Sequence, residues 1–365
     1  METKLLTAKE VNEAGKILKN GGLVGIPTET VYGLAANALD GTAVAKIFAA
    51  KGRPQDNPLI VHISRLSQLD DLVAFVPPVV YDLADVFWPG PLTIIMEKSG
   101  IIPDEVSAGL PTVAIRMPSH PLARKIIDAA GVPLAAPSAN TSGKPSPTTA
   151  DHVMHDMSGK IDAVLDGGPC GVGVESTVIT LCTRKPRILR PGRVTPEELE
   201  EVLGEVEIDD AVLGKLKDGE TAASPGMKYK HYSPNAEVFV IDADTESFRR
   251  YVNDAATKNG VSKTAALVFD GEDDGFVCKT LSFGEKDDDC AHAHKLFAAL
   301  RECDDFGFSS VYVHCPSYDG VGLAVMNRLL RAAEFKVIKL SGVDYATSRY
   351  SRGYRSDRCR KKYSL

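Results

Sequence analysis

The stretch TETVYGLAANALDGTAVAKIFAAKGRPQDNPLIVHI, residues 28–63, places an unusual set of polar side chains among Gly and Pro turns. Thr28, Thr30 and Tyr32 come directly after an apolar segment, residues 23–27. Further polar residues follow a short amphipathic run: Lys51, Arg53, Asn57 and His62. Core packing does not explain hydroxyls, cations and a histidine gathered in this way. The stretch therefore predicts a site for an anionic ligand, most simply a nucleotide.

The residues around this stretch carry helix and strand patterns without strict alternation. A capping-box pattern at residues 7–10 opens a helix, Gly21 and Gly22 end it, and a buried strand follows at residues 23–26. A second helix is predicted over residues 42–51, and a third starts at Thr195. Further strands are predicted at residues 59–63, 92–96, 112–117, 132–136, 163–166, 177–181 and 187–189. This order favours a mixed sheet with helices packed on it.

The length of 365 residues favours two domains. Residues 215–234 are rich in Gly, Ser, Pro and charge, which is typical of a linker. Beyond them a βαβ rhythm predicts a small doubly wound domain, with strands at residues 238–241, 265–269 and 311–314 and helices near 248–256, 291–300 and 322–333. The acidic residues 271–289 are expected to form a loop. The predicted division is residues 1–210, a linker at 211–236, a second domain at 237–345 and a basic tail at 346–365.

The composition is that of an ordinary globular protein. A net charge of −7 argues against a surface that coats nucleic acid along the whole chain. No apolar run is long enough for a membrane helix, and the first residues lack the core of a signal peptide. Seven widely spaced cysteines fit a reduced, cytoplasmic protein better than a disulfide framework.

The charged residues each allow two interpretations. Lys51 and Arg53 either stabilise a helix C-terminus or clamp phosphates. Arg116 lies in a strand that should be largely buried, so it needs an anionic partner, which is either a structural carboxylate or a ligand. His62 lies between two apolar residues, where a histidine is more often part of the core. The turn at residues 136–140 ends a strand with a hydroxyl and an amide, and the carboxyl ends of strands are where open sheets bind ligands.

Several common sites are excluded or disfavoured by the sequence. There is no Gly-rich phosphate loop ending in Gly-Lys-Ser/Thr, and no close cysteine pair of the kind that structural zinc requires. His292 and His294 lie two apart on a predicted helix and therefore diverge. The basic tail is either solvated or attracts RNA.

Four motifs closely resemble the YrdC-like family: Pro27–Leu34, Lys51-Gly-Arg53, residues 57–63 and Ser138-Ala-Asn140. The resemblance runs in order from about Leu6 to Gly204, and the linker with the second domain resembles the family's long, two-domain form. It implies an α/β fold with a mixed twisted sheet, helices and an open ligand cleft, linked to a smaller Rossmann-like α/β domain. The activity it implies is that of an L-threonylcarbamoyladenylate synthase, a nucleotidyltransferase that converts L-threonine, bicarbonate and ATP into threonylcarbamoyl-AMP and pyrophosphate. The product serves tRNA modification beside the anticodon.

The resemblance also implies roles for individual residues. Those that would hold threonine are Thr30, His62, Arg116, Ser138 and Ser176. Those that would hold ATP are Arg53, Asn57, Val113 through its backbone, Asn140, Thr148, Arg190 and Tyr232. Lys51 would lie over the phosphates and act with Arg53 in catalysis. Mg²⁺ would be held mainly by the ATP phosphates, with no tightly bound metal on the protein.

No side-chain nucleophile is needed for this reaction, because positioning and charge neutralisation carry it. The expected partners are small substrates, the transferase machinery that receives the intermediate and, weakly, tRNA, but no membrane.

Two alternative functions are that of a carbamoyl transferase of hydrogenase maturation and that of a non-catalytic RNA-binding module. The first should show zinc fingers and an acylphosphatase module, which are absent here, and the second does not explain the intact Lys-x-Arg and Ser-x-Asn motifs.

The linker residues 224–234 are basic and aromatic, which is unusual for a passive spacer. They are either a solvated connector or a lid whose Tyr232 reaches the nucleotide. A closed lid would exclude water and protect a labile mixed anhydride.

Overall fold

The computed structural model describes residues 2–214 and 231–340. The chain forms two compact units, with the boundary between Tyr232 and Ser233. Most of the predicted linker and the whole basic tail lie outside the described residues. Within them, no helix is both long and apolar enough to cross a lipid bilayer.

The first unit is built on one mixed sheet in the order β1-β8-β2-β3-β7-β4-β6-β5-β9-β10-β11. Its strands are β1 (Lys4–Leu6), β2 (Val24–Ile26), β3 (Gly33–Asn37), β4 (Ile60–His62), β5 (Leu92–Glu97), β6 (Thr112–Arg116), β7 (Leu134–Ala135), β8 (Ala163–Leu165), β9 (Thr177–Thr180), β10 (Arg187–Arg190) and β11 (Glu207–Ile208). Parallel pairs such as β4–β6 stand beside antiparallel pairs such as β5–β6. The mixed sheet predicted from the sequence is confirmed.

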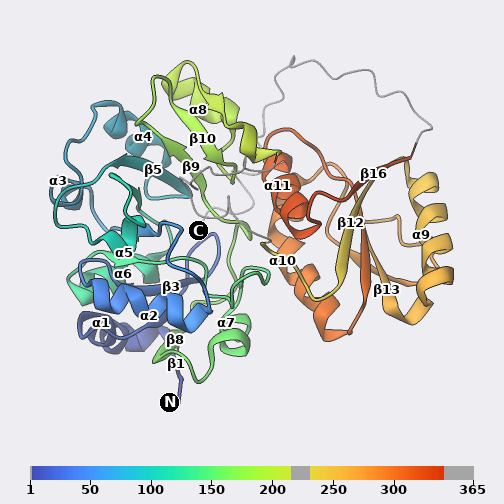
Figure 1. Ribbon diagram of the computed structural model, residues 1–365, viewed down its shortest axis with the longest axis horizontal. Helices are drawn as coiled ribbons and strands as arrows, with labels where there is room; N and C mark the ends of the chain where they lie inside the picture. The colour runs from blue at the N-terminus through green and yellow to red at the C-terminus, as the bar shows by residue number, and fades with distance from the viewer. Residues whose placement is uncertain (1, 215–230, 341–365) are drawn as a thin grey trace. The chain divides into compact units, whose positions relative to one another are not determined.

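Helices surround this sheet: α1 (Val11–Lys19), α2 (Gly41–Lys51), α3 (Leu69–Leu72), α4 (Val79–Phe87), α5 (Asp104–Ser107), α6 (Pro121–Ala130), α7 (Ala150–Met157) and α8 (Pro196–Leu203). Helices α1 and α6 pack side by side (Figure 1). The strands divide their side chains between two cores: Ala163 and Leu165 of β8 belong to the core with α1 and α6, whereas Val164 belongs to the core on the other face. Because both faces of the sheet are buried, the sequences of these strands are continuous apolar runs.

Helix α2 has both ends set by local chemistry, and this matters for the site. The Asp40 carboxylate caps its start by accepting from the backbone N–H groups of Thr42 (2.9 Å) and Ala43 (3.1 Å). Gly52 ends it in the left-handed conformation, with φ +62°. The helix therefore ends at Lys51, and the chain changes direction at Gly52, directly before Arg53.

The second unit is a five-stranded sheet in the order β14-β13-β15-β12-β16, in which every pairing is parallel. Its elements are β12 (Glu237–Asp242), α9 (Thr245–Asn259), β13 (Thr264–Val268), β14 (Lys279–Ser282), α10 (Asp289–Asp305), β15 (Ser310–His314), α11 (Gly322–Ala332) and β16 (Val337–Lys339). In Figure 1, α10 and α11 lie on one side of this sheet and α9 on the other. The predicted doubly wound α/β domain is confirmed.

Two expectations about the second unit need correction. A Rossmann-like strand order is not confirmed, since β15 lies between β13 and β12, which would be neighbours in that order. The acidic residues 271–289 are not one loop, because Lys279–Ser282 form β14. This short strand pairs with the buried β13, so tertiary pairing overrides its polar sequence.

Candidate active site

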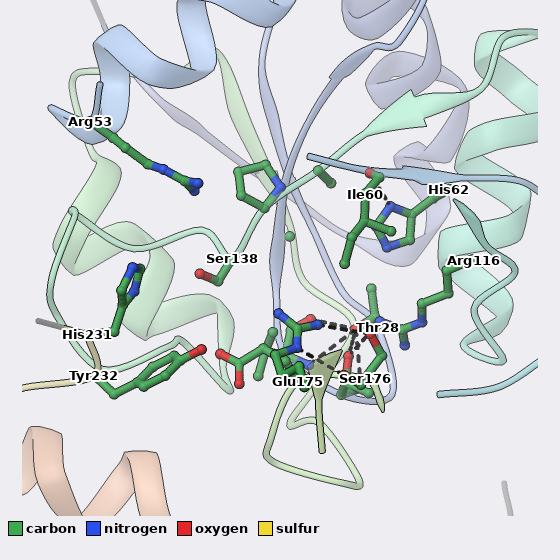
Figure 2. Close-up of a pocket in the computed structure, with 16 residues that line it drawn as sticks. Thr28, Arg53, Ile60, His62, Arg116, Ser138, Glu175, Ser176, His231 and Tyr232 are labelled. Atoms are coloured by element: carbon green, nitrogen blue, oxygen red, sulfur yellow. Dashed lines mark hydrogen bonds between the residues drawn. The ribbon is translucent and has the colours of Figure 1, made fainter. Parts of the chain in front are cut away.

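A pocket in the first unit gathers most of the predicted site residues (Figure 2). The predicted residues that line it are Thr30, Arg53, His62, Arg116, Ser138, Ser176, Arg190 and Tyr232. Other predicted residues are not part of its lining: Lys51, Asn57, Val113, Asn140 and Thr148. The sequence did not single out Glu175 and His231 for this site, although both line the pocket.

Strand ends deliver these side chains to one place. His62 and Arg116 are the last residues of the parallel neighbours β4 and β6, and they stand opposite each other in the register. Ser138 follows β7 and forms an isolated bridge with Gly33 at the start of β3. Ser176 immediately precedes β9. Polar groups next to several strand ends therefore lie around one pocket, at the carboxyl ends of β4 and β6 and at the amino end of β9.

Arg116 has a carboxylate partner within the protein. Its Nη2 lies 2.6 Å from Oε1 of Glu29, and both side chains are buried. Nη1 donates to Thr30 Oγ1 (2.9 Å), and Nε donates to the Gly90 carbonyl (3.3 Å). Burial alone would raise the pKa of Glu29, but the charge of Arg116 and its hydrogen bond hold that pKa below its usual range. Glu29 lies within the motif at residues 27–34. The signal in the sequence that could have pointed to it is the buried Arg116, which needs an anionic partner.

His62 is neutral in the folded protein. Burial, and then the positive charge of Arg116, lower its pKa from 6.5 to about 3, although Glu29 acts in the opposite direction. Its Nδ1 lies 3.2 Å from the Ile60 carbonyl oxygen. The imidazole can therefore exchange hydrogen bonds with a ligand, but it adds no positive charge to the pocket.

The hydroxyls near Arg116 are held in place by the surrounding structure. Thr28 Oγ1 donates to the Val31 carbonyl (2.5 Å) and lies 2.9 Å from Thr30 Oγ1. Ser176 Oγ lies 2.7 Å from Thr93 Oγ1 and accepts from Arg190 Nη2 at 3.1 Å. These contacts set the direction in which the hydroxyls face a ligand.

Arg53, His231 and Tyr232 lie across the pocket from His62 and Arg116 (Figure 2). Arg53 donates to the Asn57 carbonyl at 3.3 Å, and its guanidinium lies 5.8 Å from the centre of the Phe48 ring. Tyr232 is buried and adopts a positive φ of 63°, an uncommon conformation for a bulky residue. A planar cation and an aromatic ring are suited to phosphate and to a flat base, respectively.

Lys51 and Asn140 are not part of the pocket lining. The Lys51 ammonium donates to the carbonyls of Ser138 and Asn140, each at 2.6 Å, and only 3% of the residue is exposed. The Asn140 amide donates to the carbonyls of Thr141 and Lys144, each at 2.9 Å. Of the two paired motifs, Arg53 and Ser138 therefore line the pocket, whereas the side chains of Lys51 and Asn140 donate to backbone carbonyls of residues 138–144.

Comparison with known proteins identifies the family. A family model described as "Telomere recombination", for Sua5, YciO and YrdC, matches residues 16–192, and one described as "Threonylcarbamoyl-AMP synthase, C-terminal domain" matches residues 194–334. A threonylcarbamoyl-AMP synthase of Pyrococcus abyssi is 46% identical over 332 residues, which cover 91% of this chain and 96% of the relative. This chain belongs to the Sua5–YciO–YrdC family.

Further comparisons extend the family likeness to both units. A threonylcarbamoyl-AMP synthase of Bacillus subtilis is 43% identical and spans 90% of this chain and 94% of its own length. The crystal structure of P. abyssi Sua5 in complex with L-threonine superposes with a TM-score of 0.87 at 43% identity, and covers 93% of this chain and all of that one. The resemblance to the two-domain form of the family is therefore confirmed over most of the chain.

Proposed function

We propose that this protein is a threonylcarbamoyl-AMP synthase that joins L-threonine, bicarbonate and ATP into threonylcarbamoyl-AMP and releases pyrophosphate. The observation that carries the proposal is the pocket, which combines a carboxylate-binding arginine and fixed hydroxyls on one side with an arginine and a tyrosine on the other. Relatives that match nearly the whole chain bear the same name, and one has been crystallised with L-threonine.

L-Threonine would occupy the side of the pocket that contains Arg116 and His62. The guanidinium would receive the carboxylate, since Nη1 and Nη2 each carry two N–H groups and are aimed by their contacts with Thr30 and Glu29. The Ser176 and Ser138 hydroxyls, together with neutral His62, supply hydrogen bonds suited to a small polar amino acid. The amino group would then face the middle of the pocket.

ATP would occupy the side that contains Arg53, Arg190 and Tyr232. Arg53 supplies a planar fork for phosphate, and the Tyr232 ring supplies a surface for the nucleoside. Asn57, Val113, Asn140 and Thr148 remain candidates for contacts that form or adjust when the nucleotide enters. Mg²⁺ would arrive with the triphosphate as part of the substrate.

The chemistry follows from placing the two substrates in one pocket. Threonine and bicarbonate give a carbamate, water and a proton. A carbamate oxygen then attacks the α-phosphorus, the bond between the α-phosphorus and the bridging oxygen breaks, and pyrophosphate leaves. The protein contributes orientation and charge stabilisation, and this class of reaction makes it a nucleotidyltransferase. A transferase that modifies tRNA beside the anticodon would consume the labile product.

The proposal is tested by measuring pyrophosphate release with purified protein, ATP, Mg²⁺ and bicarbonate, with and without L-threonine. Release should depend on threonine, and threonylcarbamoyl-AMP should be detected by mass spectrometry. An Arg116→Met variant provides the matched control, since it keeps much of the volume but loses the carboxylate-binding fork. Threonine-independent release, or release without the adenylate, would contradict the proposed function.

A further inference from the structure

The paired motifs Lys51-Gly-Arg53 and Ser138-Ala-Asn140 divide their tasks. Arg53 and Ser138 line the pocket, whereas Lys51 is not part of the lining and donates to the backbone of the second motif. The resemblance alone placed Lys51 over the phosphates. Its observed contacts give it a different task.

The Lys51 ammonium donates to acceptors of the Ser138–Asn140 turn. It donates to the Ser138 and Asn140 carbonyls at 2.6 Å, and Asn140 Oδ1 lies 3.5 Å away. An ammonium has three N–H donors, and two of these contacts are short and charge-assisted. The backbone adds another link, because the Ser142 N–H donates to the Lys51 carbonyl at 3.0 Å. The end of α2 and the turn are thus fastened together by both side chain and backbone.

The same turn is tied to the rest of the pocket wall. The Ala139 N–H donates to the Tyr32 carbonyl at 2.9 Å, and the Leu34 N–H donates to the Pro137 carbonyl at 2.8 Å. Loss of the Lys51 contact would leave the Ser138 and Asn140 carbonyls without their charged donor, and the turn would move to satisfy them elsewhere. Such a shift would displace Ser138 on the pocket side.

We propose that Lys51 is a positioning residue that fixes the Ser138–Asn140 turn for both substrates and touches neither of them. The inference deepens the proposed function and rests on it. It differs from a role at the β- or γ-phosphate in one measurable respect. A lysine that touches the β- or γ-phosphate favours ATP over AMP, whereas a lysine that fixes the turn affects both nucleotides alike.

The test measures binding of ATP, AMP and L-threonine separately by titration calorimetry, so that no turnover occurs. In Lys51→Met we expect the affinities for ATP and AMP to fall by the same factor, about tenfold, the scale of a buried acceptor left without its donor. L-Threonine affinity should fall as well, because Ser138 lies on the same turn. The matched control is Arg53→Met, which should weaken ATP much more than AMP.

Circular dichroism establishes that each variant is folded, and Lys51→Arg provides a second variant that keeps the charge and the donors. In Lys51→Arg the ratio of ATP to AMP affinity should equal that of the wild type. A selective loss of ATP affinity in either Lys51 variant would overturn the proposal, as would unchanged binding of all three ligands in Lys51→Met. Wild-type protein that binds ATP and AMP but not L-threonine would contradict the proposed function, while an equal loss of both nucleotides in Lys51→Met would still support the role of Lys51.

Discussion

Replacing His62 with Gln should remove a specific part of the protein's sensitivity to acid. The folded protein keeps His62 neutral, with a pKa lowered from 6.5 to about 3 by burial and by Arg116. The unfolded chain takes up a proton near pH 6.5, and the folded chain takes it up near pH 3. The stability that comes from the neutral imidazole is therefore present above pH 6.5 and is lost as the pH falls toward 3.

The size of the effect follows from the two pKa values. At pH 5 the unfolded imidazole is protonated and the folded one is not, and pH 5 lies about 1.5 units below the unfolded pKa. Each unit corresponds to about 1.4 kcal/mol, so the wild type should lose about 2 kcal/mol of unfolding free energy between pH 7 and pH 5 through this residue. Because His62 is only 4% exposed, solvent screening reduces this energy of about 2 kcal/mol only slightly.

The protein contains a single tryptophan, which provides the assay. Trp88 is buried in the first unit and donates to the Leu92 carbonyl at 2.7 Å, so its fluorescence follows the unfolding of the unit that holds His62. Urea titrations at pH 7 and pH 5 would compare the wild type with His62→Gln, and with His155→Gln on the exposed side of α7 as a control. The His155 variant should keep the pH dependence of the wild type. An equal pH-dependent loss in His62→Gln and the wild type would refute the argument.

Further predictions concern the site. Arg53→Lys keeps the charge but loses the fork, so pyrophosphate release should fall about 10²-fold; release at the wild-type rate would show that Arg53 is structural. Judged by kcat/KM, 2-aminobutyrate should be a much poorer substrate than threonine, and serine an intermediate one. The reason is that a site that forms hydrogen bonds with the substrate hydroxyl rejects analogues that lack this group. Equal turnover of 2-aminobutyrate and threonine would contradict the pocket assignment. Glu29→Gln leaves Arg116 without its carboxylate and should cost about 3 kcal/mol in a Trp88-monitored urea titration; an unchanged midpoint would mean that the pair is dispensable.

The parts of the fold that were predicted from sequence are those with strong apolar patterns. The runs at β5, β6 and β9 are long enough, and rich enough in Ile, Val and Thr, to indicate buried strands. The strand β3 (Gly33–Asn37) was not predicted, because Gly-Leu-Ala-Ala-Asn has no β-branched residue and becomes a strand through its neighbours β2 and β7. Such strands are specified by pairing partners distant in sequence, and a local pattern does not reveal them.

The site was predicted unevenly for a related reason. Motifs identified several side chains that line the pocket: His62 and Arg116 at the ends of neighbouring strands, and Thr30 in the loop between β2 and β3. The role proposed for Lys51 does not follow from its motif, because its partners are backbone carbonyls, and every residue has one. A phosphate clamp and a support for a turn therefore look the same in sequence. The contacts of the ammonium in the structure favour the second interpretation.

The charges on the threonine side of the pocket lead to one more prediction. Arg116 is matched by Glu29 and His62 is neutral, so these three side chains carry no net charge. L-Threonine is a zwitterion and also carries none, whereas in the proposed function ATP would bring a highly charged triphosphate to Arg53. Salt screens attraction between net charges but has little effect on buried, short-range contacts. Raising the salt from about 0.05 M to 0.5 M should therefore weaken ATP binding several-fold and leave L-threonine binding nearly unchanged in calorimetric titrations. If threonine affinity falls as steeply as ATP affinity, Arg116 acts as an unmatched charge, and Glu29 does not neutralise it.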